Sequence, residues 1–421
     1  MSITKEQIEA RRSNLEKDFQ TVKQQIADGE VNIAGMKNNL NGLLTLLVLT
    51  AVGFQGCTDT ATEEKTMTMI DVAAYGAVQG WLKPFQEEGF AWGGNSGVYA
   101  ESPDRIFIIQ RGETRLPTPI PEGFEGWAGS VGINALRQPD LRTWQNVIFT
   151  VNREGEVTDV WDQWDHLFAD LNGPGPHRVR ISPYDPDRHV WVVDETGHRI
   201  FVFSNDGKKL VRTYGERDVS ANDQTHLGQP QDVAFLPDGR TLLADGLENK
   251  RVIILDENGD YQSEFGKSGT EELGEFAEVH ALALGPAGLL FVADRQRGVH
   301  VFQQSYDLNR DYHPEFEPIA LWEDFALALD LHATDEALWV SEVNPAAGLP
   351  RIIKLDFEGN HLYEWDLPTE GPSRFIESHS FAVDSESNLY LSDNQNARTH
   401  KFMPRDDADP NLQVKPAIVP E

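Results

Sequence analysis

Three histidines stand out among the 12 in the chain because each opens a repeated stretch of sequence at the same position. His177 begins HRVRISPYDPDRHVWVVD, His280 begins HALALGPAGLLFVAD, and His379 begins HSFAVDSESNLYLSD. If the repeats surround a common axis, equivalent positions converge, and three imidazoles can share one ion. Three histidine ligands with a fourth position left open are typical of a catalytic zinc site. The alternative is that these side chains line a channel and bind only water or one another.

The elements that would position these histidines are repeated strands. Six related units begin at Gly97, His177, Gln231, His280, Phe325 and His379, and each combines alternating apolar strands with Asp- or Gly-containing turns. From His177 onward the units start roughly every 50 residues, which is the period of a four-stranded propeller blade. One such unit cannot bury a core alone, so the six are expected to close into one ring. The histidines then belong to the second, fourth and sixth units.

The sequence therefore predicts an all-β fold, a six-bladed β-propeller of the NHL type over residues 73–408, with a tail at 409–421. The first unit is stretched by a proline-rich insertion at Leu116–Phe124. The strand that closes the ring comes either from residues 70–96 or from the C-terminal tail, and the sequence leaves this choice open.

Three stretches resemble the peptidyl-α-hydroxyglycine α-amidating lyase family. They are NDQTHLGQPQDVAF at Asn222–Phe235, VHALALGPAGLLFVADRQRGVHVF from Val279, and IFIIQRGE at Ile106–Glu113. The likeness covers roughly residues 97–403 and implies a six-bladed NHL propeller. It also implies a zinc ion bound by His177, His280 and His379, with Arg111 as the active-site arginine.

The resemblance implies a carbon–nitrogen lyase reaction as well. In the family, zinc polarises the substrate hydroxyl, a base removes its proton, and the C–N bond breaks to give a peptide amide and glyoxylate. A Lewis acid lowers the pKa of a hydroxyl, and a guanidinium pairs well with a carboxylate. A small molecule or a peptide is the expected substrate. For Arg111 the alternative is an ordinary salt bridge.

The sequence departs from the family at two positions. Leu247 stands where the family has its catalytic tyrosine, and Ser380 stands where the family has an aspartate that helps to hold a structural calcium ion. The calcium is therefore doubtful. The base is left open among three tyrosines and a zinc-bound hydroxide; the tyrosines are Tyr99, Tyr184 and Tyr214.

Two other functions remain open on the sequence. A different metal-dependent propeller enzyme, such as a lactonase-like hydrolase, usually has Glu, Asp and Asn ligands around calcium, so the three histidines disfavour it. A non-catalytic propeller that binds a protein or a glycan at the cell surface is favoured by Leu247. No phosphate-binding glycine loop or Gly-x-Ser-x-Gly turn stands out.

The composition limits the classes of molecule that the protein is expected to bind. The formal net charge is −32, so the surface repels the phosphates of nucleic acids and anionic lipids. We therefore expect no nucleic acid partner. The single cysteine, Cys57, cannot form an internal disulfide and lies outside the repeats.

The first 72 residues differ in character from the repeats. Residues 1–35 are expected to contain an amphipathic helix at 2–28 with a heptad-like apolar seam, which could mediate coiled-coil self-association. Residues 36–57 resemble a signal peptide, with a short apolar run at Leu43–Phe54 and a lipobox-like Gly56-Cys57.

Residues 58–72 would then be a tether, and Met36 a plausible start. These features favour a bacterial cell-envelope protein, periplasmic or extracellular, that contacts the membrane only through an N-terminal lipid anchor or apolar segment. The rival interpretation keeps Met1 as the start and reads a helix that leads into a membrane-associated segment.

Overall fold

The computed structural model describes residues 74–83, 85–306, 314–344, 349–369 and 374–419. The chain divides into two compact units, 1–66 and 67–421, and the described residues all belong to the second. The helix, the apolar segment and the tether predicted in residues 1–72 lie outside the described residues. Within the described part of the chain, no helix is long and apolar enough to cross a membrane.

The described residues form six four-stranded antiparallel sheets in chain order, one for each sequence unit. Sheets 1 to 3 consist of β3 (Asn95–Ser102), β4 (Arg105–Gln110), β7 (Ile148–Val151) and β8 (Val157–Val160); β9 (Pro176–Ile181), β10 (Val190–Asp194), β11 (Arg199–Phe203) and β12 (Leu210–Tyr214); and β13 (Asp232–Phe235), β14 (Thr241–Asp245), β15 (Arg251–Leu255) and β16 (Tyr261–Phe265).

Sheets 4 to 6 follow the same plan. They consist of β19 (Val279–Leu284), β20 (Leu289–Asp294), β21 (Gly298–Tyr306) and β22 (Pro314–Trp322); β23 (Ala328–Ala333), β24 (Leu338–Asn344), β25 (Leu349–Leu355) and β26 (His361–Asp366); and β27 (Ser378–Val383), β28 (Leu389–Asp393), β29 (Arg398–Pro404) and β1 (Tyr75–Ala77).

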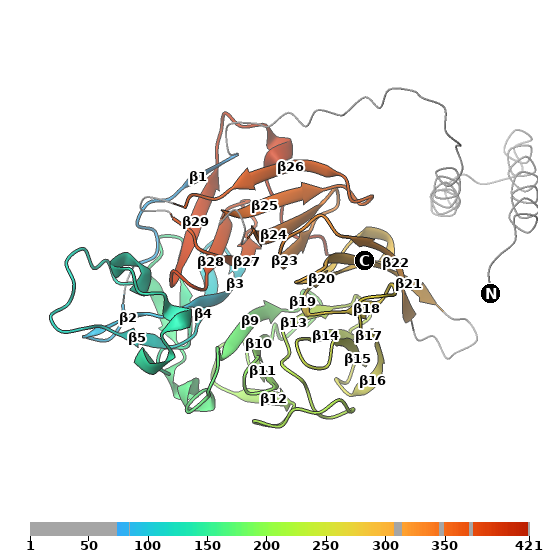
Figure 1. Cartoon of the computed structure of the whole chain (residues 1–421), viewed down its shortest axis with the longest axis horizontal. Helices are drawn as coiled ribbons and strands as arrows, with labels where there is room; N and C mark the ends of the chain where they lie inside the picture. The colour runs from blue at the N-terminus through green and yellow to red at the C-terminus, as the bar shows by residue number, and fades with distance from the viewer. Residues whose placement is uncertain (1–73, 84, 307–313, 345–348, 370–373, 420–421) are drawn as a thin grey trace, which may run out of the picture. The chain divides into compact units, whose positions relative to one another are not determined.

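The first strands of the six sheets lie innermost and contact one another in a closed circle. β3 contacts β9, β9 contacts β13, and the series continues through β19, β23 and β27 back to β3. Figure 1 shows these strands gathered at the centre with the sheets radiating from them. The fold is therefore a β-propeller, as the repeats predict.

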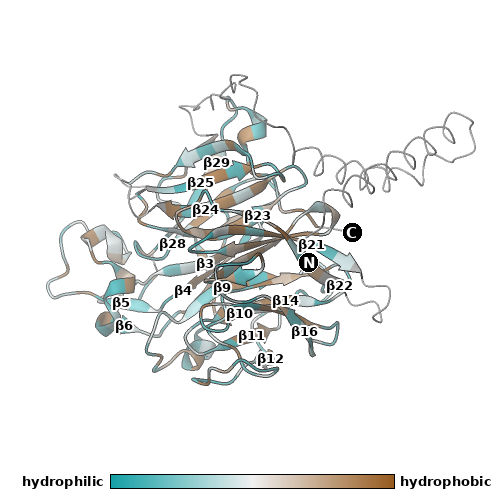
Figure 2. Cartoon of the chain, turned by 45° about the vertical axis from the view of Figure 1, so that its right-hand side comes forward, coloured by the Kyte–Doolittle hydropathy of each residue, from teal (hydrophilic) through white to brown (hydrophobic). Residues whose placement is uncertain are grey.

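The core lies between neighbouring sheets. The middle strands are apolar and buried on both faces, as in the VWVVD sequence of β10, whereas the outermost strand β12 alternates between half-buried and exposed residues. Figure 2 shows the same gradient from brown inner strands to more hydrophilic outer edges. Strands with two buried faces are expected to be continuously apolar, and strands with one buried face to alternate.

The N-terminal strand β1 closes the ring. It pairs antiparallel with β29 and so becomes the outermost strand of sheet 6, whose other three strands come from the C-terminal end of the repeats. The sequence left this role open between residues 70–96 and the tail, and the structure assigns it to Tyr75–Ala77. The tail instead packs on the sheets, with Val414 buried and the N–H of Ile418 donating to the carbonyl of Ala333.

The stretched first unit carries an insertion between β4 and β7. The insertion contains β5 (Glu113–Arg115), three short 3-10 helices and then β6 (Arg142–Thr143). β5 and β6 form a small sheet with β2 (Phe90–Trp92), which precedes β3 in the chain. The 3-10 helices of the described chain are η2 (Ala128–Val131), η3 (Ala135–Arg137), η4 (Pro139–Leu141), η5 (Asp162–Leu167), η6 (Pro286–Gly288) and η7 (Pro410–Leu412), and a short parallel pair joins β17 (Lys267–Ser268) to β18 (Glu275–Phe276).

Candidate metal centre

The three repeat-initial histidines lie at the second position of the inner strands β9, β19 and β27. The pairing register shifts at each of them: Pro176 and Arg178, for example, pair with consecutive residues of β10, so His177 is an extra residue between them. The same shift brackets His280 and His379. A β-bulge of this kind redirects a side chain, and bulges are common beside active sites. Here they turn the imidazoles away from the regular strand pattern.

Each ring is held by the next sheet around the axis. The Nδ1 atoms of His177, His280 and His379 lie 2.7, 2.6 and 2.7 Å from the carbonyl oxygens of Gln231, Leu329 and Ser96. A carbonyl can only accept, so Nδ1 carries the proton and Nε2 keeps its lone pair. A histidine that binds a metal through one nitrogen typically donates its other N–H to such a partner.

The three imidazoles converge. Their ring centroids are 4.8 Å apart for His177 and His280, 4.7 Å for His177 and His379, and 5.4 Å for His280 and His379. One ligand nitrogen from each ring lies within 4.8 Å of the others, so the group could hold a metal ion. All three side chains are buried, and Nε2 of His280 has no partner.

Burial also fixes the protonation state of these rings. Removal from water lowers the pKa of all three well below the ordinary value of 6.5, and neighbouring positive charges lower the pKa further. Neutral imidazole is the form that binds a metal ion. The residues therefore fit a divalent ion with three nitrogen ligands, which is a set that zinc accepts.

Arg111 lies at the same end of the sheets as the histidines. Arg111 directly follows β4, and the last residue of β4 pairs with the first residue of the inner strand β3. In the sheets that carry a histidine, the histidine is the second residue of the inner strand, so Arg111 lies near the same level. The side chain is buried, and its Nη2 lies 3.5 Å from an oxygen of Glu195. Its Nε and Nη1 atoms are buried without a partner. Two donors are therefore available to an anionic group.

Several charged residues at this end were not singled out from the sequence. Glu195 and Arg295 occupy the position equivalent to Arg111 in sheets 2 and 4, directly after the second strand. Arg295 donates to Glu278 at 2.6 Å. Burial raises the pKa of the Glu195 and Glu377 carboxyls, and Arg111 opposes both shifts. The shared position after the second strand is the sequence signal that would have found Glu195 and Arg295.

The aspartates that end the second strands position the histidine-bearing strands. Asp294 accepts hydrogen bonds from the backbone N–H groups of Ala277 and Glu278, just before His280. Asp393 accepts one from the N–H of Ile376, just before His379. The repeated aspartate of the sequence therefore anchors the chain where it enters the inner strand.

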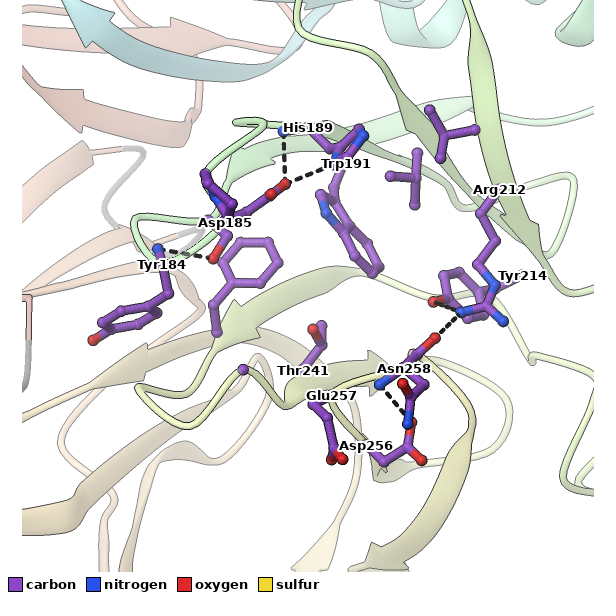
Figure 3. Close-up of a pocket in the computed structure, with 17 residues that line it drawn as sticks. Tyr184, Asp185, His189, Trp191, Arg212, Tyr214, Thr241, Asp256, Glu257 and Asn258 are labelled. Atoms are coloured by element: carbon purple, nitrogen blue, oxygen red, sulfur yellow. Dashed lines mark hydrogen bonds and ion pairs between the residues drawn. The ribbon is translucent and has the colours of Figure 1, made fainter.

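The tyrosines considered as bases lie elsewhere. Tyr99 donates to the carbonyl of Ile181, at the far end of β9 from His177. Tyr184 and Tyr214 line a pocket of about 420 Å³ that also includes the β9–β10 turn, shown in Figure 3. Leu247 follows Gly246 after β14, so no phenol stands at this position.

A second group that could hold a metal ion consists of Asp185, Asp187 and His189, of which Asp185 and His189 line the same pocket. The oxygens of Asp185 are already engaged, because they accept hydrogen bonds from the backbone N–H of Asp187 and from both the backbone and ring nitrogens of His189. Figure 3 shows Asp185 turned toward His189 beside Trp191. These hydrogen bonds explain the group as a turn of the chain. Its residues are half-buried or exposed, whereas the three histidines are all buried.

Comparison with known proteins agrees with the family suggested by the sequence motifs. No family model matches the chain. A probable peptidyl-alpha-hydroxyglycine alpha-amidating lyase of Caenorhabditis elegans is 31% identical over 123 residues, which are 29% of this chain and 34% of that protein. Peptidyl-alpha-hydroxyglycine alpha-amidating lyase 1 of Drosophila melanogaster is 27% identical over 257 residues, 56% of this chain and 46% of that protein. The resemblance to this lyase family is confirmed.

The chain spans between a third and a half of the length of these curated relatives. Among solved structures, a streptogramin B lyase covers 79% of this chain and 98% of its own at 13% identity and a TM-score of 0.44. A virginiamycin B lyase from Staphylococcus aureus covers 76% and 97% at 15% identity and a TM-score of 0.42.

Proposed function

We propose that the protein is a zinc-dependent lyase that cleaves the N–C bond of an α-hydroxyglycine-type substrate to give an amide and glyoxylate. The observation that supports this most is the convergence of His177, His280 and His379, each with Nδ1 bonded to a carbonyl so that Nε2 is the nitrogen left for a metal ion. Two relatives named as amidating lyases support the reaction class.

The described residues fit the substrate in two ways. A zinc ion, when bound by the three histidines, supplies a Lewis acid that polarises an oxygen of the substrate. Arg111 would bind the substrate carboxylate, because two of its donors are buried without a partner and a charged hydrogen bond is strong in such surroundings. Glu195 keeps the guanidinium in place from its other side.

The reaction conserves all atoms. The hydroxyl loses its proton, its oxygen forms the carbonyl of glyoxylate, the C–N bond breaks, and the nitrogen gains a proton to become the amide. Because residue 247 is a leucine, the group that accepts the hydroxyl proton is not a tyrosine at this position.

Glyoxylate release from an α-hydroxyglycine peptide tests the proposal. We expect zinc-dependent release by the full chain and loss of release in the His280→Ala variant, with a lactone as the control substrate for hydrolase activity. A chain that binds zinc but releases no glyoxylate would instead be the non-catalytic binding propeller that Leu247 favours. Turnover of the lactone alone would support a propeller hydrolase.

We further propose that the protein is a lipid-anchored envelope protein, on the strength of the apolar run that ends at Gly56-Cys57. The mass of the native N-terminal peptide tests this idea. A diacylglyceryl-modified Cys57 at the N-terminus is the expected result, and an unmodified chain that starts at Met1 would contradict it.

A further inference from the structure

A layer of charged residues lies directly beneath the histidines. Arg178, Asp330 and Ser380 each follow the bulge residue of their inner strand, Asp232 is the first residue of β13, and all four are buried. Arg180, two residues after Arg178 on β9, faces the same aspartates. Two guanidinium groups and two carboxylates therefore meet on the axis, and their formal charges cancel.

Arginine and serine donors bond to the two aspartates of this layer. Arg178 donates through Nη1 to an oxygen of Asp330 at 3.2 Å, and its Nε lies 3.9 Å from Asp232. Arg180 donates through Nη2 to Asp232 at 3.1 Å and to Asp330 at 3.0 Å. The hydroxyl of Ser380 donates to Asp330 at 2.9 Å. The carboxylates are thus engaged by the protein's own donors.

These residues do not fit a structural calcium ion. Calcium takes six to eight oxygen ligands and is favoured by several carboxylates. Here the aspartate that the family resemblance would supply is Ser380, whose hydroxyl points its proton at Asp330, and the guanidinium of Arg178 already brings a positive charge between the two aspartates. A further cation would meet that charge without compensation.

The charged layer is bonded to the histidine layer through two carbonyl groups. The carbonyl of Leu329 accepts from Nδ1 of His280 at 2.6 Å and from Nη2 of Arg178 at 2.9 Å. The carbonyl of His379 itself accepts from Nη1 of Arg178 at 3.0 Å. Among the described residues, Arg180 bonds to the carboxylates of Asp232 and Asp330 and to no carbonyl of the histidine layer. Arg178 therefore fixes backbone atoms that set the orientation of two of the three metal-binding rings.

We propose that Arg178 is a built-in cation that takes the place of a structural metal ion and positions His280 and His379 for metal binding. The proposal rests on the metal-binding part of the proposed function and not on the lyase reaction. It makes the protein independent of calcium, and it makes Arg178 a positioning residue for the metal centre.

Metal titration of the full chain tests the positioning role, with ZnCl2 and CoCl2 as the probes. Loss of an outer partner of a metal ligand typically weakens metal affinity roughly 10- to 100-fold. We expect this loss in Arg178→Met, together with a changed visible spectrum of bound cobalt. The matched control is Arg180→Met, which removes the same charge beside the same aspartates and should leave the cobalt spectrum unchanged. Equal effects of the two variants, or none, would overturn the role of Arg178.

Calcium titration of the unchanged chain tests the replacement directly and needs no variant to fold. We expect no heat of binding with CaCl2 and no shift of the unfolding temperature with calcium or with a calcium chelator. Tight stoichiometric calcium binding that raises the unfolding temperature would overturn the replacement. If the unchanged chain bound no zinc or cobalt, the proposed function and the positioning role would both fail, whereas the calcium result would still decide the replacement.

Discussion

At the scale of single residues, an ion pair joins Arg111, which follows the second strand of sheet 1, to Glu195, which follows the second strand of sheet 2. Both side chains are nearly buried, and only one guanidinium nitrogen of Arg111 faces Glu195. Burial disfavours the charged form of each group, and each partner offsets that cost for the other. Such a pair leaves the remaining donors of Arg111 oriented for an anionic ligand.

The Arg111→Met variant should lose much of its transition-state stabilisation for a carboxylate substrate. Removing one partner of a buried charged hydrogen bond to a ligand costs on the order of 3 kcal/mol of binding, so kcat/KM for glyoxylate release should fall about 100-fold or more. A substrate whose carboxylate is replaced by an amide separates a loss of substrate binding from a loss of folding. The unchanged protein and Arg111→Met should turn over that substrate with equal kcat/KM. The exposed Arg405→Met serves as the control, and unchanged kinetics in Arg111→Met would contradict the assignment.

At the scale of elements, ring closure depends on a strand of three residues. Tyr75 on β1 accepts a hydrogen bond from the N–H of Val414 at 2.8 Å and stacks on Trp365 with ring centroids 5.8 Å apart. It thus ties the N-terminal strand, sheet 5 and the C-terminal tail together. A short strand with few ladder hydrogen bonds relies on such side-chain contacts for its stability.

The Tyr75→Phe variant tests this closure. It leaves the buried N–H of Val414 without an acceptor, which should lower the free energy of unfolding by about 1–3 kcal/mol. Urea unfolding of the full chain measures the change. Tyr261→Phe, in which a more exposed hydroxyl is removed, should shift the same free energy by less than about 0.5 kcal/mol. Equal effects of the two substitutions would show that Tyr75 does not secure the ring.

The contact between β23 and the C-terminal tail predicts a pH dependence. Burial lowers the pKa of His332 to about 4, and its Nε2 donates to the carbonyl of Lys415 at 2.8 Å. The unfolded chain therefore binds a proton at this residue before the folded chain does as the pH falls. Stability from His332 is fully present above pH 6.5 and is lost as the pH falls through about 4.

The His332→Gln variant retains a donor to Lys415 but cannot titrate. Between pH 6.5 and 4 the unchanged protein should lose on the order of 3 kcal/mol more stability than this variant. Denaturant unfolding at a series of pH values checks the difference, with exposed His166→Gln as the control. Parallel pH profiles for the unchanged protein and His332→Gln would rule out this contribution.

The sequence predicted the sheets and the convergence of the three histidines, because both follow from a repeat that recurs in register. It did not predict the carbonyl partners of the histidines or the charged layer beneath them. The partners depend on the β-bulges at His177, His280 and His379, and a bulge leaves no mark in an alternating apolar pattern. The role of Arg178 was hidden because its aspartate partners come from two other sheets, far away in the chain.

At the scale of the whole molecule, the strongly acidic net charge of −32 contrasts with the compensated charges on the axis of the propeller. The excess negative charge repels itself and destabilises the compact state, while salt weakens that repulsion. Salt screens the charges of Arg178, Asp232 and Asp330 far less, because these three side chains are buried, and Arg180 pairs with both aspartates from a partly exposed position.

Thermal unfolding of the full chain should therefore shift upward by a few degrees when sodium chloride is raised from low to physiological concentration. Differential scanning calorimetry at several salt concentrations measures the shift. A neutral osmolyte at matched osmolality is the control, since it should not reproduce the salt dependence. A fall of the unfolding temperature with salt would mean that surface ion pairs outweigh the net repulsion.

Zinc analysis of the dialysed full chain is the most direct test of whether the three inner-strand histidines of this β-propeller form one metal centre. We expect one zinc ion per chain in the unchanged protein and in His332→Gln, and none in His177→Ala, His280→Ala or His379→Ala. A chain without stoichiometric zinc, or one that retains zinc after these three substitutions, would contradict this expectation.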